Sequence, residues 1–443
     1  MEECKETAVY MCGYLPGVSQ EKSPILSPVP VPVPLHGSES WNEVCGGGCG
    51  FAMAISGSGK LVTWGSTDDE SQSYSTCGKH GEIPERLPLP CEDSVVKASA
   101  GWAHCVSVLE TGRYTWGWKE CVPLQKTHGS GITGEKVPHS DNKNAGEEIL
   151  KRRKVTGPKE EFETLPSNEE FFTSTPSMVA LGPGVRITTV AAGGRHTLAL
   201  SDVGQVWGWG YGGEGQLGLG SRIKMVSSPH LIPCIESSAS ERDRSAVVNQ
   251  GSADLSSQAS KLPGSCVKQI ACGGRHSAVV TDAGVLLTFG WGLYGQCGQG
   301  SVTDQLRPTS VNSLSGIQVE GIAAGLWHTV CSTISGSVYA FGGNQFGQLG
   351  TGSDQAETRP KLLDSPSLES KRVKAVSCGA RHSFILTENG EVFSWGWNKY
   401  GQLGLGDTMD RNMPSQVGLL EGCQPKNVAC GWWHTLLLSE TPP

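Results

Sequence analysis

The hydrophobic residues of this chain occur in short runs, and glycine, aspartate or asparagine separates one run from the next. The segments HTLALSD, beginning at His196, and GQVWGWG, beginning at Gly204, are typical. Short apolar runs with β-branched and aromatic content, bounded by turn-forming residues, predict β-strands joined into hairpins.

These runs belong to a unit that recurs along the chain. Each unit has two small residues, two variable residues, a histidine, an apolar run, a glycine and then an aromatic residue followed by glycine. Copies begin at Ala191, Ala271, Ala323 and Ser377, with weaker copies from Gly46 and Ser99 and a truncated copy from Ala429. The marker position holds Phe51 in the first unit and then histidine in six units: His104, His196, His276, His328, His382 and His434.

The length of the unit predicts the fold. About four short strands in about 53 residues are typical of one blade of a β-propeller. Seven units and two inserts, of about 39 and about 27 residues, account for nearly the whole chain, so we expect an all-β fold with one seven-bladed β-propeller over residues 1–443. The last unit stops after its inner strands, and residues 7–17 match its missing outer half. The N- and C-terminal strands should therefore share one blade and close the ring.

Two groups of motifs carry a family resemblance. A Gly-x-x-His-Ser/Thr segment stands at residues 193–197, 273–277, 379–383 and 431–435, and a Gly-Gln-x-Gly tetrad at residues 215–218, 295–298, 347–350 and 401–404. On these motifs the chain resembles the regulator-of-chromosome-condensation repeat family over about 85% of its length. The resemblance implies a seven-bladed β-propeller, with relatives among plant members that include the group of the UV-B photoreceptor.

Composition and charge narrow the expected classes of function. The chain has 60 Gly and 13 Trp, and 35 Lys and Arg against 43 Asp and Glu give a net charge of -8. A globally basic surface for nucleic acid is therefore not expected, and neither is direct sequence-specific binding of nucleic acid. No stretch approaches the ~18 apolar residues of a membrane span, so no membrane partner is expected. The acidic N-terminus fits neither a secretory signal nor a transit peptide, and with 16 Cys the expected compartment is cytosol or nucleus.

The repeated histidines and aromatic residues suggest structural roles. A metal or catalytic role for the six histidines is the competing interpretation, but equivalent positions of seven blades lie too far apart to share an ion at ~2 Å. We therefore expect half-buried histidines with hydrogen bonds within or between blades, no metal, no cofactor and no catalytic residues. The aromatic residues before the repeated glycine are predicted to fill the core between blades: Trp64, Trp209, Phe289, Phe341 and Trp395.

The two residues before each histidine vary between units, as expected of a binding surface. They are predicted to begin the innermost strand and to line one rim of the central channel. The partner-binding candidates are Trp102, Arg195, Arg275, Trp327, Arg381, Trp432 and Trp433. Arginine and tryptophan are enriched at interaction hot spots, and the three arginines suit a carboxylate or a phosphate. Pairing of these arginines with acidic residues of neighbouring blades is the alternative.

The resemblance implies a comparison with the UV-B photoreceptor, which carries tryptophans at the first of these two positions in consecutive blades. Those tryptophans form a cluster. Here only Trp102 and Trp432 match, and the other units carry Cys49, Gly194, Gly274, Leu326 and Ala380. The consecutive cluster is therefore expected to be absent, which disfavours light sensing.

Three segments depart from the repeat. Residues 119–185 form a charged insert with a basic run, Lys151, Arg152, Arg153 and Lys154, that is typical of nuclear-import signals; a solvated charge run is the alternative. Residues 221–264 form a Ser-rich insert, predicted to be flexible. Residues 18–40 form a Pro-rich strap, in which 24–34 should be an extended polyproline spacer, with a docking segment for a peptide as the alternative.

The leading hypothesis is a non-enzymatic nuclear propeller, with a cytoplasmic pool allowed, that binds a protein partner. Histones or a regulatory complex are the expected partners, and family analogy suggests stress or light responses. The alternatives are a guanine-nucleotide exchange factor for a small nuclear GTPase, which the family's founding member implies, and a sensor like the UV-B photoreceptor. Exchange factors need no cofactor, so the sequence leaves that activity open.

Overall fold

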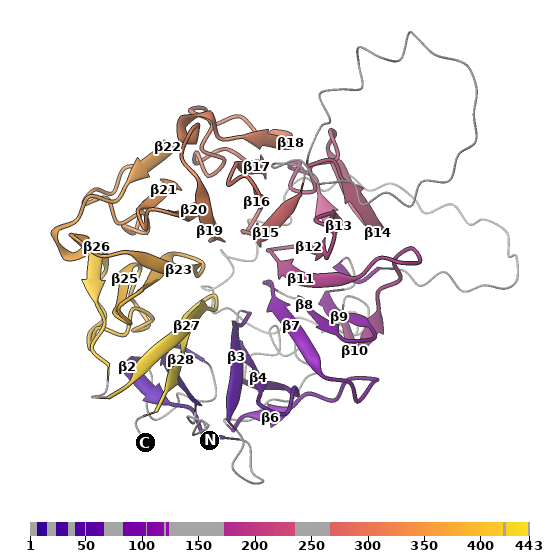
Figure 1. The fold of residues 1–443 in the computed structure, drawn as a ribbon, viewed down its shortest axis with the longest axis horizontal. Coiled ribbons are helices and arrows are strands. Elements are labelled where there is room, and N and C mark those ends of the chain that lie inside the picture. The colour runs from indigo at the N-terminus through magenta and orange to yellow at the C-terminus, as the bar shows by residue number, and fades with distance from the viewer. Residues whose placement is uncertain are drawn as a thin grey trace, which may run out of the picture.

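We analysed a computed structural model of the chain. The structure describes residues 7–15, 24–33, 40–48, 50–65, 83–102, 104–118, 121–123, 172–234, 266–419 and 422–441. These residues form seven four-stranded antiparallel sheets arranged as blades around a central channel (Figure 1). The predicted all-β, seven-bladed propeller is thus confirmed. No helix in the described ranges is long and apolar enough to cross a membrane.

Six blades are built from four strands that follow one another along the chain, from the channel outward. The first is β3 (Trp41–Gly46), β4 (Phe51–Ser56), β5 (Leu61–Gly65) and β6 (Glu85–Arg86), and the second is β7 (Val95–Ala100), β8 (His104–Leu109), β9 (Arg113–Trp118) and β10 (Phe172–Met178). The third is β11 (Ile187–Ala192), β12 (His196–Ser201), β13 (Val206–Gly212) and β14 (Ile223–Ile232), and the fourth is β15 (Val267–Cys272), β16 (His276–Thr281), β17 (Leu286–Gly290) and β18 (Gln305–Ser310). The fifth is β19 (Val319–Ala324), β20 (His328–Thr333), β21 (Val338–Gly342) and β22 (Glu357–Leu362), and the sixth is β23 (Val373–Cys378), β24 (His382–Thr387), β25 (Val392–Gly396) and β26 (Arg411–Gln416). Two 3-10 turns, η4 (Asn312–Leu314) and η5 (Pro366–Leu368), precede β19 and β23.

The seventh blade joins the two ends of the chain. Its inner strands are β27 (Gln424–Cys430) and β28 (His434–Glu440), and its outer strands are β1 (Thr7–Gly13) and β2 (Ile25–Pro30). β1 pairs with β28 along its whole length, from Thr7 opposite Glu440 to Gly13 opposite His434. The predicted closure by strands from both ends is therefore confirmed.

Three segments that were predicted to be irregular each contain the outermost strand of a blade. β2 lies within 18–40, where a polyproline spacer was expected; β10 lies within 119–185; and β14 lies within 221–264. Outer strands are half exposed and carry no regular apolar alternation, so their sequences resemble those of loops. Prolines in β2 are tolerated because a strand at the sheet edge has one row of N–H groups that need no partner.

The second strand of every blade is buried at nearly every position, since neighbouring blades cover both of its faces. That two-sided burial explains the continuous apolar runs of the repeat. The five aromatic residues predicted for the core are at most 2% exposed. Trp395 of the sixth blade, for example, packs in one cluster with Val330 and Leu349 of the fifth. The core is therefore a set of layers between adjacent blades.

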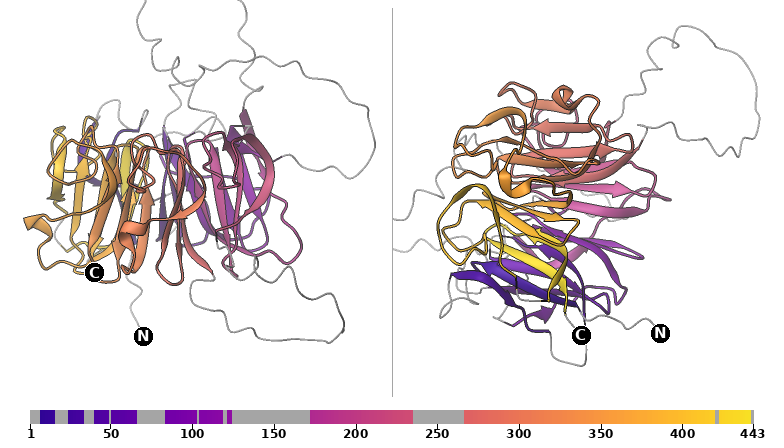
Figure 2. Two further views of the ribbon diagram at one scale, coloured as in Figure 1. Left: turned by 90° about the horizontal axis from the view of Figure 1, so that it is seen from above. Right: turned by 60° about the vertical axis from the view of Figure 1, so that its left-hand side comes forward.

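Each blade presents two of its turns on the same side of the ring, which we call the turn face. One turn joins the first strand to the second, and the other joins the third to the fourth. His382 at the start of β24 pairs with Gly396 at the end of β25, so both turns of the sixth blade lie at this edge. Figure 2 shows the ring from the side, with the strands running between its two faces.

The turn face corrects one prediction about the residues that precede each histidine. They do not begin the innermost strand but lie in the turn between the innermost strand and the second. The reason is that the small residues before them, such as those of β23, already form the innermost strand. The first residue of each pair lies at the channel, as Leu326, Ala380 and Trp432 do, and the second lies farther out on the turn face.

Glycine after the core aromatic residue holds the two turns together. Gly396 has a φ of 107°, and a Cβ atom there would lie 2.5 Å from the carbonyl oxygen of Arg381. The next residue, Trp397, donates its backbone N–H to that same carbonyl at 2.9 Å. This close approach brings the residue before the histidine next to the residue that follows the glycine.

Candidate functional site

The repeated histidines lie between blades and are fully buried, not half-buried as expected. In five of the six, Nε2 lies within hydrogen-bonding distance of the hydroxyl group that follows the histidine of the next blade. The pairs are His104–Thr197, His196–Ser277 and His276–Thr329 at 2.8 Å, His328–Ser383 at 2.9 Å and His382–Thr435 at 3.0 Å. Each pair ties one blade to its neighbour.

The hydroxyl groups determine which ring nitrogen carries the proton. Ser277 Oγ donates to the carbonyl oxygen of Gln216 at 2.8 Å, and the equivalent hydroxyls of Thr329, Ser383 and Thr435 donate to tetrad glutamines in the same way. A hydroxyl that donates to a carbonyl accepts from His Nε2, so Nε2 carries the proton. The Nδ1 atom of His196 is buried without a hydrogen-bond partner, as it is in His104, His276, His328 and His382.

Burial keeps these histidines neutral. It lowers the pKa of His196, His276, His328 and His382 to about 3 and that of His104 and His434 to about 4. Within the described ranges, no three His, Cys, Asp or Glu side chains are grouped as a metal site would require. The geometry therefore supports a structural role for the histidines.

The interfaces of the first blade differ from the others. Phe51 replaces the histidine there, and Cys105 replaces the hydroxyl residue of the next blade; both belong to one buried apolar cluster. On the other side of this blade, Ala52 stands where a hydroxyl residue would face His434. The Nε2 atom of His434 is accordingly buried without a partner. The interfaces on both sides of the first blade thus lack the histidine–hydroxyl hydrogen bond that is present at the other five.

Arg381 is the centre of a group of side chains on the turn face. It lies between β23 and β24, and four aromatic rings surround its guanidinium carbon. The ring centroids of Phe346, Trp397, Trp327 and Trp433 lie 4.6, 5.2, 5.3 and 6.0 Å from that carbon. These rings come from the fifth, sixth and seventh blades, so one cation joins three blades through cation–π contacts.

Ring contacts continue from Arg381 toward the channel. The centroid of Trp433 lies 5.2 Å from that of Trp397 and 6.3 Å from that of Trp432. Trp432 in turn lies 5.7 Å from Trp102 of the second blade, with the ring planes 32° apart. The two tryptophans that match the photoreceptor position are therefore in contact, although the first blade lies between theirs in the ring.

A second row of contacts runs from Arg381 toward the fourth and third blades. Trp327 lies 5.1 Å from Tyr294, which lies 5.4 Å from Trp291. The guanidinium carbon of Arg275 lies 5.0 Å from the Trp291 ring. All seven partner-binding candidates lie on the turn face, and this row connects three of them, Arg275, Trp327 and Arg381.

Arg275 and Arg195 are linked by a carboxylate. Arg275 Nη1 lies 3.5 Å from Glu214 Oε1, and Tyr211 donates its hydroxyl to the same carboxylate oxygen at 3.4 Å. The guanidinium carbon of Arg195 lies 4.9 Å from the Tyr211 ring. Arg275 thus follows the alternative of pairing with a neighbouring blade. We call the whole set the aromatic network: Trp102, Arg195, Tyr211, Glu214, Arg275, Trp291, Tyr294, Trp327, Phe346, Arg381, Trp397, Tyr400, Trp432 and Trp433.

Several rings of the aromatic network were not predicted as site residues. Tyr294, Phe346 and Tyr400 each stand directly before a Gly-Gln-x-Gly tetrad, which is a signal that the sequence does contain. Tyr400 lies 5.3 Å from Trp397 and also stacks on Tyr14 at 5.0 Å. The rings before the tetrads therefore build the outer part of the turn face. The predicted nuclear-import run, Lys151, Arg152, Arg153 and Lys154, lies outside the described residues.

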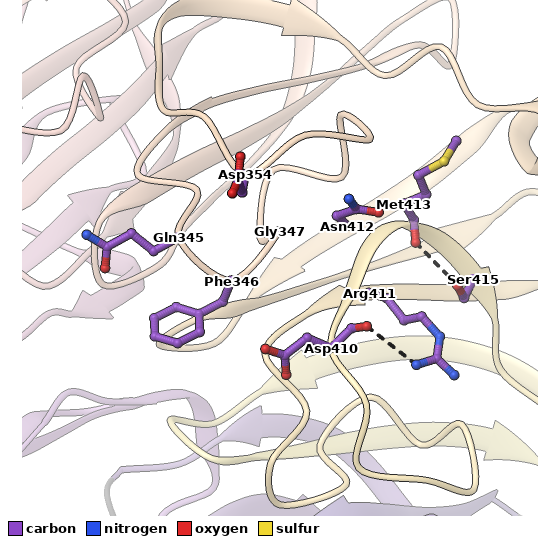
Figure 3. A pocket seen from close by; sticks show the side chains of 9 residues that line it. All are labelled: Gln345, Phe346, Gly347, Asp354, Asp410, Arg411, Asn412, Met413 and Ser415. Atoms are coloured by element: carbon purple, nitrogen blue, oxygen red, sulfur yellow. Dashed lines mark hydrogen bonds between the residues drawn. The ribbon is translucent and has the colours of Figure 1, made fainter.

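A shallow pocket of about 390 Å³ adjoins the aromatic network between the fifth and sixth blades (Figure 3). Phe346, whose ring contacts Arg381, is part of its lining, together with Asp354, Asp410 and Met413. Asp410 accepts a hydrogen bond from the backbone N–H of Asn398 at 2.7 Å. Asp354 and Asp410 thus place two carboxylates in the pocket, and the guanidinium of Arg411, which also lines it, pairs with Asp407 at 2.6 Å.

Comparison with known proteins places this geometry in a family. A sequence profile of the RCC1-like domain matches residues 157–441. The chain is 28% identical over 401 residues to the ultraviolet-B receptor UVR8 of Arabidopsis thaliana, which covers 89% of this chain and 73% of the receptor. It is 33% identical over 326 residues to the human E3 ubiquitin-protein ligase HERC2, of which it spans only 6%.

Solved structures show the same fold. Prp20p of Saccharomyces cerevisiae superposes with a TM-score of 0.71 at 18% identity, covering 99% of this chain and 93% of that one. Human WBSCR16 superposes with a TM-score of 0.70 at 22% identity, covering 99% and 100%. Since the profile spans well over half of the sequence and the repeats form the expected blades, this chain belongs to the RCC1-like domain family.

Proposed function

We propose that this protein is a non-enzymatic interaction propeller that binds a protein partner through the aromatic network of its turn face. The observation that carries the proposal is the connected set of rings, guanidinium groups and one carboxylate drawn from six of the seven blades. Trp102 remains 40% exposed, and the arginine and aromatic side chains around Arg381 are half-buried. Partly exposed, rigid aromatic and arginine side chains are the typical anchors of protein interfaces.

The partner we propose is a nuclear protein, with histones as the first candidate. The crystal structure of Prp20p is described together with binding of that protein to Gsp1p and histones, which supports this class of partner by analogy within one fold. The basic run at residues 151–154 supports a nuclear location, and a role in stress or light responses is the finer part of the proposal.

Affinity capture from nuclear extract tests the proposal. The intact protein is compared with a variant in which Arg195, Arg275, Arg381 and Trp433 are alanine. A matched control carries Arg372→Ala, which removes an arginine that pairs with Glu388 at the opposite face. We expect histones with the intact protein and the control but not with the four-residue variant. Equal capture by all three would exclude the turn face as the binding surface.

Two other activities remain candidates within the family. Capture of a small GTPase in its nucleotide-free form, followed by stimulated nucleotide release, would replace the histone proposal with an exchange-factor role. The similarity to UVR8 and the contact between Trp102 and Trp432 favour a test of light sensing. In that test, UV-B irradiation that changes tryptophan fluorescence or the association state would support a sensor.

A further inference from the structure

The charge environment of Arg381 differs from that of three other arginines on the described surface, Arg222, Arg275 and Arg411. Arg222, Arg275 and Arg411 each lie within 2.6 to 3.5 Å of an Asp or Glu oxygen. Arg381 makes no ion pair or hydrogen bond with any residue in the described ranges, and its buried Nε has no partner. The Arg381 side chain as a whole is half-buried and not fully buried. The guanidinium therefore offers donors to a ligand from outside the chain.

Aromatic rings hold this cation in place before any ligand binds. The rings of Phe346, Trp397 and Trp327 lie 4.6 to 5.3 Å from its central carbon and replace part of the water that would otherwise solvate it. Burial lowers the pKa of the guanidinium, which nonetheless stays charged at neutral pH. A donor fixed in this way loses little conformational entropy when a partner binds, so a single contact here contributes more than one from a free surface arginine.

The chemistry around Arg381 favours one carboxylate over a phosphate. A planar guanidinium matches a carboxylate in bidentate geometry, whereas phosphorylated peptides are usually bound by clusters of arginines. Here Arg275 of the network is already neutralised by Glu214, and Arg411 beside Phe346 is paired with Asp407. A net charge of -8 also disfavours a polyanion such as nucleic acid.

The pocket beside Phe346 restricts which residues can flank that carboxylate in the partner. Asp354 and Asp410 line the pocket, and the cation of its lining, Arg411, is paired with Asp407 at 2.6 Å, so a second acidic residue on this side would be repelled. Phe346 and the 39%-exposed Met413 offer apolar surface at the same place. In an extended segment, side chains two positions apart point to the same face and lie about 7 Å from each other, which lets one residue reach Arg381 while the residue two positions along lies over Phe346.

We propose that Arg381 is the anchor for a single Asp or Glu side chain in a partner segment, with an uncharged apolar residue two positions from it packed over Phe346. This inference rests on the proposed function and specifies the partner that the turn face would select. It predicts that one carboxylate, and not the overall acidity of a segment, decides binding.

Selection from a displayed peptide library tests the inference with the full chain. Random 12-residue segments are selected on the intact protein, on an Arg381→Gln variant and on an Arg372→Gln control. Enriched peptides are then synthesised with amidated ends, so that only side chains supply carboxylates. Three variants of each peptide are also made. In the first Gln replaces the acidic residue, in the second phosphoserine replaces it, and in the third a second Glu replaces the apolar residue that would lie over Phe346.

We expect binding, measured by fluorescence anisotropy, to weaken about tenfold or more when the acidic residue becomes Gln, as for loss of a charged hydrogen bond. Arg381→Gln should cause a similar loss with the acidic peptide but little change with its Gln form. Arg381→Lys should not restore binding, because a lysine lacks the planar pair of donors. The second Glu should weaken binding, and Arg372→Gln should have no effect.

Other results would overturn the inference. If peptides bind through Trp433 or Trp327 without any preference for an acidic residue, the interaction surface stands but the role of Arg381 is wrong. If no selected peptide is sensitive to changes in the aromatic network, the proposed function fails as well. Tighter binding of the phosphoserine form would identify a phosphate site. Loss of peptide binding when the protein self-associates would identify a second copy of this chain as the occupant. Because the decisive substitutions are also made in the peptide, misfolding of a propeller variant cannot mimic the expected result.

Discussion

Lowering the pH should destabilise this propeller in a window set by its buried histidines. The folded state holds six histidines with pKa values of about 3 to about 4, whereas an unfolded histidine titrates near 6.5. Since the folded pKa is the lower one, the unfolded state binds more protons below pH 6.5. Stability is therefore complete above pH 6.5 and falls as the pH drops from there toward the folded pKa values.

The expected loss is large. Each histidine lowers the free energy of unfolding by about 1.4 kcal/mol per pH unit once the pH is well below 6.5, and by about 1.2 kcal/mol between pH 7 and 5.5. Six of them give about 7 kcal/mol over that range, which is comparable with the total stability of a typical domain. The backbone N–H of Met409 lowers the pKa of Asp407. The titration of Asp407 therefore affects stability only below about pH 4, and it does not contribute to the change between pH 7 and 5.5.

Urea unfolding followed by tryptophan fluorescence at a series of pH values between 7.5 and 5 measures this dependence. A variant with His276→Gln keeps a donor for Thr329 but removes one titrating group, so its slope should be lower by about one proton. A free energy of unfolding that stays level from pH 7 to 5.5 would refute the assignment of neutral histidines. So would a slope that His276→Gln leaves unchanged.

Four further predictions concern the ring and its location. Deleting residues 1–17 removes β1 from the closing blade and should lower the melting temperature by about 10 °C or more; an unaltered melting temperature would contradict closure. Ser277→Ala leaves His196 without its acceptor and should cost about 1–3 kcal/mol in urea unfolding, whereas the exposed Ser335→Ala should cost almost nothing. Ala52→Ser should raise the free energy of unfolding by about 1 kcal/mol, because it supplies the hydroxyl that His434 lacks; no gain would argue against the hydrogen bond. Replacing residues 151–154 with alanine should abolish nuclear accumulation of a tagged protein, and an unchanged nuclear signal would exclude the import hypothesis.

Features that repeat in phase were predictable from the sequence. The marker histidines and the core aromatic residues occur at fixed positions in successive units, so the periodicity alone implies that they share one kind of environment between blades. The outermost strands could not be predicted in this way, because β2, β10 and β14 lie at sheet edges where exposure removes the apolar pattern. β2 also contains prolines, which in the sequence predict a spacer. Only its pairing with β1 in the structure shows that it is a strand.

The sequence predicted several residues of the candidate site but not the contacts between them. The variable residues before each histidine identify Arg275 and Arg381 equally well. Only the spatial neighbours distinguish them, since Glu214 pairs with Arg275 while four rings surround Arg381. Such neighbours come from turns of adjacent blades, and the conformations of those turns decide which side chains meet.

The shared seventh blade has a consequence for synthesis of the protein. β1 is synthesised before the strands of the first six blades, and β28, with which it pairs, is synthesised after them. Those six blades contain strands that are close together in sequence and can form as translation proceeds, whereas the seventh cannot be completed until β28 has been made. Until then β1 lacks its partner on one side, so completion of the ring should be the slow step and the one that most needs a chaperone.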